Sequence, residues 1–167
     1  MSKVYSLKYV QVLPVSLQTA WDFFSRPGNL KDITPPSLNF KILEADGGEH
    51  MYAGQLIEYK VHPILGIPLY WMTEITHVKE LEYFVDEQRY GPYSLWHHQH
   101  HFREVENGVE MTDIVHYKIP FGFLGDWANS LFIKNQLEEI FSFRFQKAEA
   151  LFGVVKQKTA SAAAFPV

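Results

Sequence analysis

The sequence predicts an α+β fold in which a curved antiparallel sheet of about seven strands wraps around one long C-terminal helix. Residues 126–156 repeat apolar side chains at steps of three and four, whereas residues 38–118 have the pattern of short strands separated by turns. A sheet of that size cannot leave its apolar face open, and only the last helix is long enough to cover it. We therefore expect a single domain over residues 1–156, followed by a flexible tail over residues 157–167.

The N-terminal part predicts one strand followed by two short helices. Residues 3–13 are rich in Val, Tyr and Leu, which is typical of a strand. Ser16 is a good N-cap for a short helix, because its hydroxyl can accept from a free N–H of the first turn. Pro27 and Gly28 break that helix, and a single further turn is expected at residues 30–33.

The middle of the chain predicts an antiparallel meander, because short strands follow one another across tight turns. The strongest turn signal is Asn107-Gly108, which suits the positive φ angles of a type I′ hairpin. The six strands are expected near residues 38–44, 52–61, 68–78, 82–90, 94–104 and 109–118.

The last helix is expected to begin at the N-cap Asp126 and to run to about Lys156. Arg144 interrupts its apolar stripe, at a position in register with buried residues. The stripe consists of Ile133, Leu137, Ile140, Phe141, Ala148, Leu151, Phe152 and Val155.

The composition excludes several classes of function. The net charge of −4 is spread without long runs, so nothing indicates a nucleic-acid partner. Cysteine is absent, which excludes disulfides, thiolate metal sites and thiol nucleophiles. No apolar run approaches a membrane span and the N-terminus lacks a signal-peptide core, so we expect a cytoplasmic protein of undefined oligomeric state. The aromatic share of 16% favours either a bulky core or an aromatic-lined cavity.

Ionisable side chains alternate onto the inward face of two neighbouring strands. In residues 94–104, His98 and His100 share a face with the large aromatics Trp96 and Phe102, which marks that face as inward. Asp113 lies on the apolar face of the next strand. Together with Arg144 these residues place four ionisable groups inside, where they must pair with one another, with water or with a ligand.

Three interpretations of this cluster are open from the residues alone. The groups can be satisfied structural residues of the core. His98, His100 and Asp113 can supply a zinc site, but same-face neighbours are common by chance and Arg144 opposes a cation, so we expect no metal and no other cofactor. A His–Asp pair can act as general base with Arg144 stabilising an oxyanion, although no nucleophile stands in an elbow-like setting.

The order of elements resembles the helix-grip fold of the START-like, or SRPBCC, ligand-binding superfamily, including its polyketide cyclase branch. The resemblance covers nearly the whole chain to about residue 152. It implies a cavity between the sheet and the C-terminal helix that holds lipids, sterols, hormones or polyketides. Local runs similar to a bacterial SRPBCC branch are Ile33-Thr34-Pro35-Pro36, Phe84-Val85-Asp86-Glu87-Gln88 before Gly91-Pro92, Trp96-His97-His98 with His100 and Phe102, Met111-Thr112-Asp113 with Pro120-Phe121-Gly122, and Ile140-Phe141 with Arg144.

We therefore expect a binding protein for a small hydrophobic molecule, lipid-, sterol- or polyketide-like, that carries a polar or acidic group. The alternative is an enzyme of the polyketide cyclase or dehydratase kind, in which His98 or His100 transfers a proton. A third hypothesis is an interaction module whose own side chains fill the cavity. The expected ligand-binding residues are Trp96, His98, His100, Asp113 and Arg144, with Tyr59, Trp71, Tyr117 and Phe141 as aromatic lining.

Overall fold

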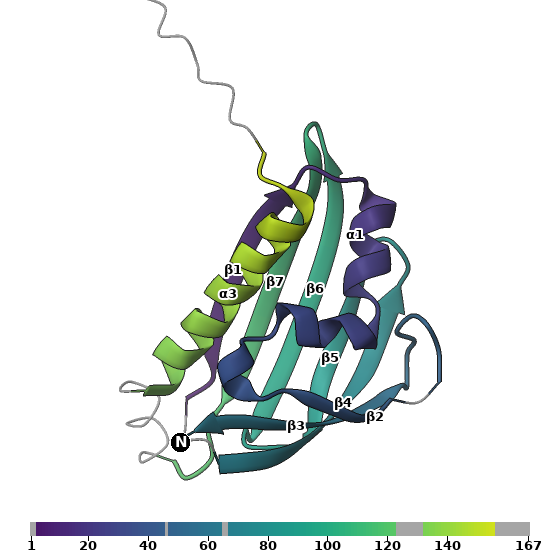
Figure 1. The fold of residues 1–167 in the computed structure, drawn as a ribbon. Helices are drawn as coiled ribbons and strands as arrows, with labels where there is room; N and C mark the ends of the chain where they lie inside the picture. Colours follow the sequence, from purple (N-terminus) through teal and green to yellow (C-terminus); the bar gives the residue numbers. More distant parts are fainter. Residues whose placement is uncertain (1–2, 46, 65–66, 123–131, 156–167) are drawn as a thin grey trace, which may run out of the picture.

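The computed structural model of the chain describes residues 3–45, 47–64, 67–122 and 132–155. A curved antiparallel sheet carries the C-terminal helix α3 and the short helix α1 on the same face (Figure 1). The fold predicted from the sequence is confirmed. Among the described helices, none is both long and apolar enough to cross a membrane.

The strands form one seven-stranded sheet in the order β1-β7-β6-β5-β4-β3-β2. From β2 to β7 each strand pairs with its successor, as the meander predicted, while β1 joins the far side of the sheet by pairing with β7. The bounds are β1 Tyr5–Leu13, β2 Lys41–Ala45, β3 Leu56–Ile64, β4 Ile67–Lys79, β5 Tyr83–Tyr90, β6 Leu95–Val105 and β7 Gly108–Lys118.

Strands β2 and β3 differ most from the prediction. Strand β2 begins three residues late, because Pro36–Leu38 forms the 3-10 turn η2, which ends at Asn39 with a left-handed φ of 43°. Strand β3 begins at Leu56 and continues through the Pro63 that was expected to lie in a turn. A register shift between Val61 and Ile64 interrupts the regular pairing there, and irregular pairing of this kind is where a strand tolerates proline.

The β6–β7 hairpin lies where Asn107-Gly108 predicted it, with Val105 paired to Gly108. The predicted type I′ turn is wrong, because Gly108 has a positive φ of 139° and Asn107 does not. A Cβ atom at position 108 would overlap the carbonyl oxygen of Leu13. The glycine is therefore required by a close backbone approach as well as by its φ angle.

The short helices follow the first strand as predicted. Helix α1 spans Leu17–Phe24, and its N-cap Ser16 accepts a hydrogen bond on Oγ from the backbone N–H of Thr19 at 3.1 Å. The second helix, η1, is a 3-10 helix over Pro27–Ile33. It starts three residues before the expected turn, because a proline without an N–H suits the first helical position.

Helix α3 spans Lys134–Phe152, and Leu137, Phe141 and Ala148 are its buried residues. It ends before the predicted Lys156, because Gly153 takes a φ of 91° and stops the helix. Val155 therefore lies beyond the helix. The predicted N-cap Asp126, the end point Lys156 and the tail 157–167 lie outside the described residues.

Leu151 was expected on the buried stripe of α3, but it is 51% exposed. At about 100° per residue it lies roughly 80° around the helix from Phe141, at the edge of the stripe. Ile133 and Ile140 occupy similar edge positions and are half-buried.

Two groups of buried residues form the core. One packs α1 against the sheet and contains Trp21, Phe24, Phe84 and Phe102. The other packs α3 against β7 and contains Val115, Tyr117, Ile119, Leu137 and Phe141. Members of both groups border the cavity described next, so this cavity lies where the two halves of the core meet.

Candidate ligand-binding site

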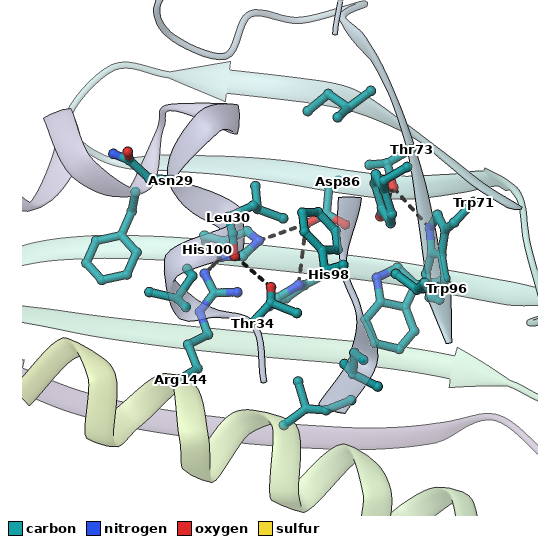
Figure 2. A pocket seen from close by; sticks show the side chains of 18 of the residues that line it. Asn29, Leu30, Thr34, Trp71, Thr73, Asp86, Trp96, His98, His100 and Arg144 are labelled. Atoms are coloured by element: carbon teal, nitrogen blue, oxygen red, sulfur yellow. Dashed lines mark hydrogen bonds and ion pairs between the residues drawn. The ribbon is translucent and has the colours of Figure 1, made fainter. Parts of the chain in front are cut away.

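A cavity of about 170 Å³ lies between the sheet, the short helices and α3 (Figure 2). Its walls are mostly aromatic and aliphatic. Seven of the nine expected site residues border it: Tyr59, Trp71, Trp96, His98, His100, Phe141 and Arg144. Further lining residues not singled out from the sequence include Phe24, Leu30, Phe40, Thr73, Asp86 and Tyr93.

The other two expected residues do not border this cavity. Tyr117 is 1% exposed and packs against the rings of Tyr5 and Tyr93 within the core. Asp113 borders a separate void of about 20 Å³ on the α3 side and contacts the histidines from there. Asp113 therefore lies behind the cavity wall, where it contacts His98 and His100, which border the cavity.

A cluster of two histidines and two carboxylates forms one polar part of the cavity wall. The sheet register places Asp86 of β5 opposite His98 of β6, and His100 opposite Asp113 of β7. The two imidazole rings lie with their centroids 3.7 Å apart. All four side chains are nearly inaccessible to solvent. The alternation of β6 and β7 points His98, His100 and Asp113 inward, and Asp86 faces them from β5.

Every imidazole nitrogen of the cluster contacts a carboxylate oxygen. Oδ1 of Asp113 lies 3.0 Å from Nε2 of His98 and 2.8 Å from Nδ1 of His100. Oδ2 of Asp86 lies 3.4 Å from Nδ1 of His98 and 2.8 Å from Nε2 of His100. Each carboxylate therefore bridges both rings.

Asp86 is the member of this cluster that was not expected as a site residue from the sequence. It faces inward on β5, and its side chain is 15% exposed. The available signal was its pairing: a strand aligned antiparallel to β6 places an inward residue opposite an inward His98. The run Phe84-Val85-Asp86-Glu87-Gln88 contributes to the family resemblance, which does not by itself place Asp86 in the site.

Arg144 reaches the cluster from α3, as Figure 2 shows. Its Nη2 atom lies 3.3 Å from Nδ1 of His100 and 4.0 Å from Oδ1 of Asp113. Its side chain is 17% exposed, and its buried Nε has no hydrogen-bond partner among the residues that the structure describes. Arg144 therefore keeps donor capacity that a bound molecule can use.

The pKa values of the two histidines shift in opposite directions. Burial and the neighbouring His100 lower the pKa of His98. Burial also acts against the charged form of His100, but hydrogen bonding to Asp113 and Asp86 outweighs it and raises the pKa of that imidazole. Burial likewise opposes ionisation of Asp113, yet Arg144 and both imidazoles hold the pKa of its carboxyl well below the ordinary value.

A second polar group in the cavity wall is satisfied internally. Oγ1 of Thr73 lies 2.6 Å from the Tyr59 hydroxyl and accepts from Nε1 of Trp71 at 3.1 Å. Burial raises the pKa of the Tyr59 hydroxyl far above its ordinary value, so that group stays neutral. The cluster and Arg144 are therefore the better place for a ligand's polar atom.

Comparison with known structures gives the fold. Protein CV1439 from Chromobacterium violaceum matches with a TM-score of 0.68 at 14% identity, over 89% of this chain and 98% of that one. Protein Ms6760 from Mycobacterium smegmatis matches with a TM-score of 0.64 at 18% identity, over 90% and 96%. Major latex-like protein 151 from Panax ginseng matches with a TM-score of 0.65 at 14% identity, over 89% and 97%.

No curated protein matches the sequence. The family model described as polyketide cyclase / dehydrase and lipid transport matches residues 13–164, which is nearly the whole chain. The strand order and the gripped C-terminal helix agree with that match. The chain therefore belongs to the polyketide cyclase / dehydrase and lipid transport family, within the SRPBCC helix-grip superfamily.

Proposed function

We propose that the protein binds a small apolar molecule carrying one polar group in the cavity between the sheet and α3. The observation that carries this proposal is the cavity itself: an aromatic lining with ionisable groups gathered in one part of its wall. Such a combination is typical of ligand sites, in which apolar walls supply affinity and a few polar groups fix orientation. The family match supports the same class of function.

The size of the cavity favours a compact ligand. Its volume of about 170 Å³ is close to that of an engineered cavity of roughly 150 Å³ that admits benzene. Ligand sites for larger molecules usually enclose about 300–1,000 Å³. A one- or two-ring polyketide-like molecule therefore suits the cavity better than a sterol or a long lipid.

The charges of the cluster favour an uncharged polar group on that ligand. Asp86 and Asp113 contribute −2 and Arg144 contributes +1, so the sum is −1 with neutral imidazoles and zero with one imidazolium. Two imidazoliums with centroids 3.7 Å apart would repel each other strongly. In neither favoured state does the site carry the positive charge that a carboxylate needs, so a hydroxyl or carbonyl is preferred.

Binding is favoured over proton-transfer catalysis by the contacts of the imidazoles. All four ring nitrogens of His98 and His100 already face carboxylate oxygens. A general base must have a nitrogen within hydrogen-bond reach of the proton that it removes. A cyclase or dehydratase would therefore have to break one of these contacts, whereas binding leaves them in place.

Isothermal titration calorimetry with benzyl alcohol and with benzoate tests the proposal. We expect saturable binding of benzyl alcohol with a negative heat-capacity change, because apolar surface is buried, and weaker binding of benzoate. Ile140→Trp should abolish binding, because residue 140 lines the cavity from α3. Phe143→Trp is the matched control, since this half-buried residue of the same helix does not border the cavity. Binding that survives Ile140→Trp would place the ligand elsewhere.

Native mass spectrometry of the purified chain supplies an independent check. A co-purified molecule of one or two rings would agree with the cavity volume. A co-purified sterol or long-chain lipid would show that the cavity expands far beyond the size described here, and our size argument would then fail.

A further inference from the structure

Three residues in the cavity wall hold one potential metal-ligand atom each close together. They are Asp86, His98 and His100, and these atoms lie within 4.8 Å of one another. Oδ2 of Asp86 lies 3.4 Å from Nδ1 of His98 and 2.8 Å from Nε2 of His100. All three residues border the cavity, so the centre between these atoms adjoins it.

Asp113 fixes both rings from the opposite side. Its Oδ1 contacts the remaining nitrogen of each ring, Nε2 of His98 at 3.0 Å and Nδ1 of His100 at 2.8 Å. A carboxylate in that position can accept an N–H from each ring. In that tautomer the nitrogen of each ring that faces Asp86 carries a lone pair, and metal binding replaces the hydrogen bond between Nε2 of His100 and Oδ2 of Asp86.

A divalent ion between these atoms would accept an electron pair from each of the three residues, in a site that solvent hardly reaches.

We propose that Asp86, His98 and His100 bind one divalent transition-metal ion, with zinc as the best match, and leave its fourth position open to the cavity. Two histidines and one carboxylate form a ligand set that zinc accepts with an open coordination position. Ligand atoms at zinc bond lengths of about 2.0–2.1 Å lie about 3.3 Å apart in a tetrahedron. The distance from Asp86 to His98 already fits, and that to His100 needs to open by about half an ångström.

Asp113 completes the site by contacting the other ring nitrogen of each histidine. Histidines that bind metals almost always donate their other N–H to a carboxylate or carbonyl group, which fixes the tautomer and the ring orientation. Here one carboxylate does this for both histidines. The set considered from the sequence was His98, His100 and Asp113, whereas this site takes Asp86 as its carboxylate ligand and leaves Asp113 on the far side of both rings.

Arg144 is compatible with a cation at this centre. Its Nη2 approaches Nδ1 of His100, the nitrogen on the Asp113 side, and not Nε2, which faces the centre. A divalent ion with both carboxylates and Arg144 gives the site a charge of +1. A hydroxide in the fourth position neutralises that charge. This proposal does not depend on the function proposed above.

Equilibrium dialysis of the full chain against Zn²⁺, with elemental analysis, tests the site. We expect one zinc per chain, and Asp86→Asn and His98→Gln should each weaken binding at least 100-fold. Asp113→Asn should weaken it about 10- to 100-fold, because it loosens both rings without removing a ligand. Co²⁺ in place of zinc should give the intense visible absorption of a four-coordinate site.

The same strand supplies a matched control for adventitious binding. His97 and His101 alternate with the proposed ligands and lie on the outward face of β6. The double variant His97→Gln/His101→Gln should keep the tight zinc. Loss of zinc in that variant with retention in Asp86→Asn would assign uptake to the surface and overturn the proposal. Absence of zinc uptake by the folded wild-type chain would also overturn it, and the cluster would then be held by a proton.

Discussion

Phe141 offers the clearest test of how α3 is held, because its ring joins the core, the cavity and the ionisable cluster. The residue is 5% exposed and lies in the middle of the helix. Its ring stacks on Tyr9 of β1 with centroids 4.6 Å apart, and its edge meets His98 with centroids 5.5 Å apart. Phe141→Ala removes both contacts together with most of the buried surface.

The stability lost in Phe141→Ala can be estimated from these contacts. Truncating a buried Phe to Ala usually costs about 3–5 kcal/mol, which includes the cavity term. Phe141 already borders a void, so part of its surface has no packing partner to lose, and we expect about 3–4 kcal/mol. That corresponds to a fall of roughly 6–16 °C in Tm for a chain of this size.

Denaturant unfolding of both Phe141→Ala and Phe143→Ala measures the effect. Phe143 lies two positions away on α3, is half-buried and has Lys147 near its ring, so its truncation should cost about 1 kcal/mol. The comparison holds helix propensity constant, because the same substitution is made in the same helix. Equal costs at the two positions, or a larger cost at 143, would refute the assigned orientation of α3.

Three further predictions concern charge, backbone and pH. Arg144→Met should change the free energy of unfolding by less than about 1 kcal/mol, since the lost attraction to a carboxylate 4.0 Å away is offset by relief of desolvation; strong destabilisation rescued by Asp113→Asn would contradict this. Gly108→Ala should cost about 1–3 kcal/mol by urea unfolding, because its Cβ overlaps backbone at a positive φ, whereas Gly28→Ala, with open space around it, should be nearly neutral. Burial raises the pKa of the Tyr59 hydroxyl in the folded chain above that of the unfolded chain. The neutral, buried hydroxyl therefore stabilises the fold fully below about pH 10, and this stabilisation is progressively lost at higher pH. Urea midpoints should fall more between about pH 9 and pH 11 in wild type than in Tyr59→Phe.

Alternation along two strands predicted most of the polar part of the site. On β7 every second residue from Val109 to Tyr117 is buried, and this pattern includes Asp113. On β6 the large aromatics Trp96 and Phe102 identified the inward face and so placed His98 and His100. Regular alternation made these predictions possible, because a two-residue period fixes the face of every residue once one is known.

Asp86 could not be placed in the same way because β5 is irregular. Phe84 and Val85 are adjacent and both buried, so the burial of this strand does not alternate cleanly. Its pairing with β4 shifts register between Ile75 and His77. A sequence alone does not reveal where such a shift falls, and a shift of one residue moves every later side chain to the other face.

The sequence also did not predict where the last helix ends. The apolar spacing continues past Phe152 to Val155, so periodicity alone favoured a longer helix. Gly153 ends it through a backbone conformation that the period of the side chains does not encode. Periodicity therefore identified the face of the helix that packs against the sheet, but it overestimated how far the helix extends beyond Phe152.

The position of β1 in the sheet has a consequence for how the chain folds. Strands β2 to β7 each pair with a neighbour in sequence, but Tyr5 pairs with Tyr117 and Leu13 with Val109. Strand β1 therefore pairs with the last strand of the described sheet, and closing that long loop makes slow folding intrinsic to the topology. Until β1 pairs with β7, the 11 residues of β7 form an open sheet edge with one apolar face, and another chain can pair with that edge. Mutations that weaken β1 should thus promote aggregation before they visibly lower equilibrium stability.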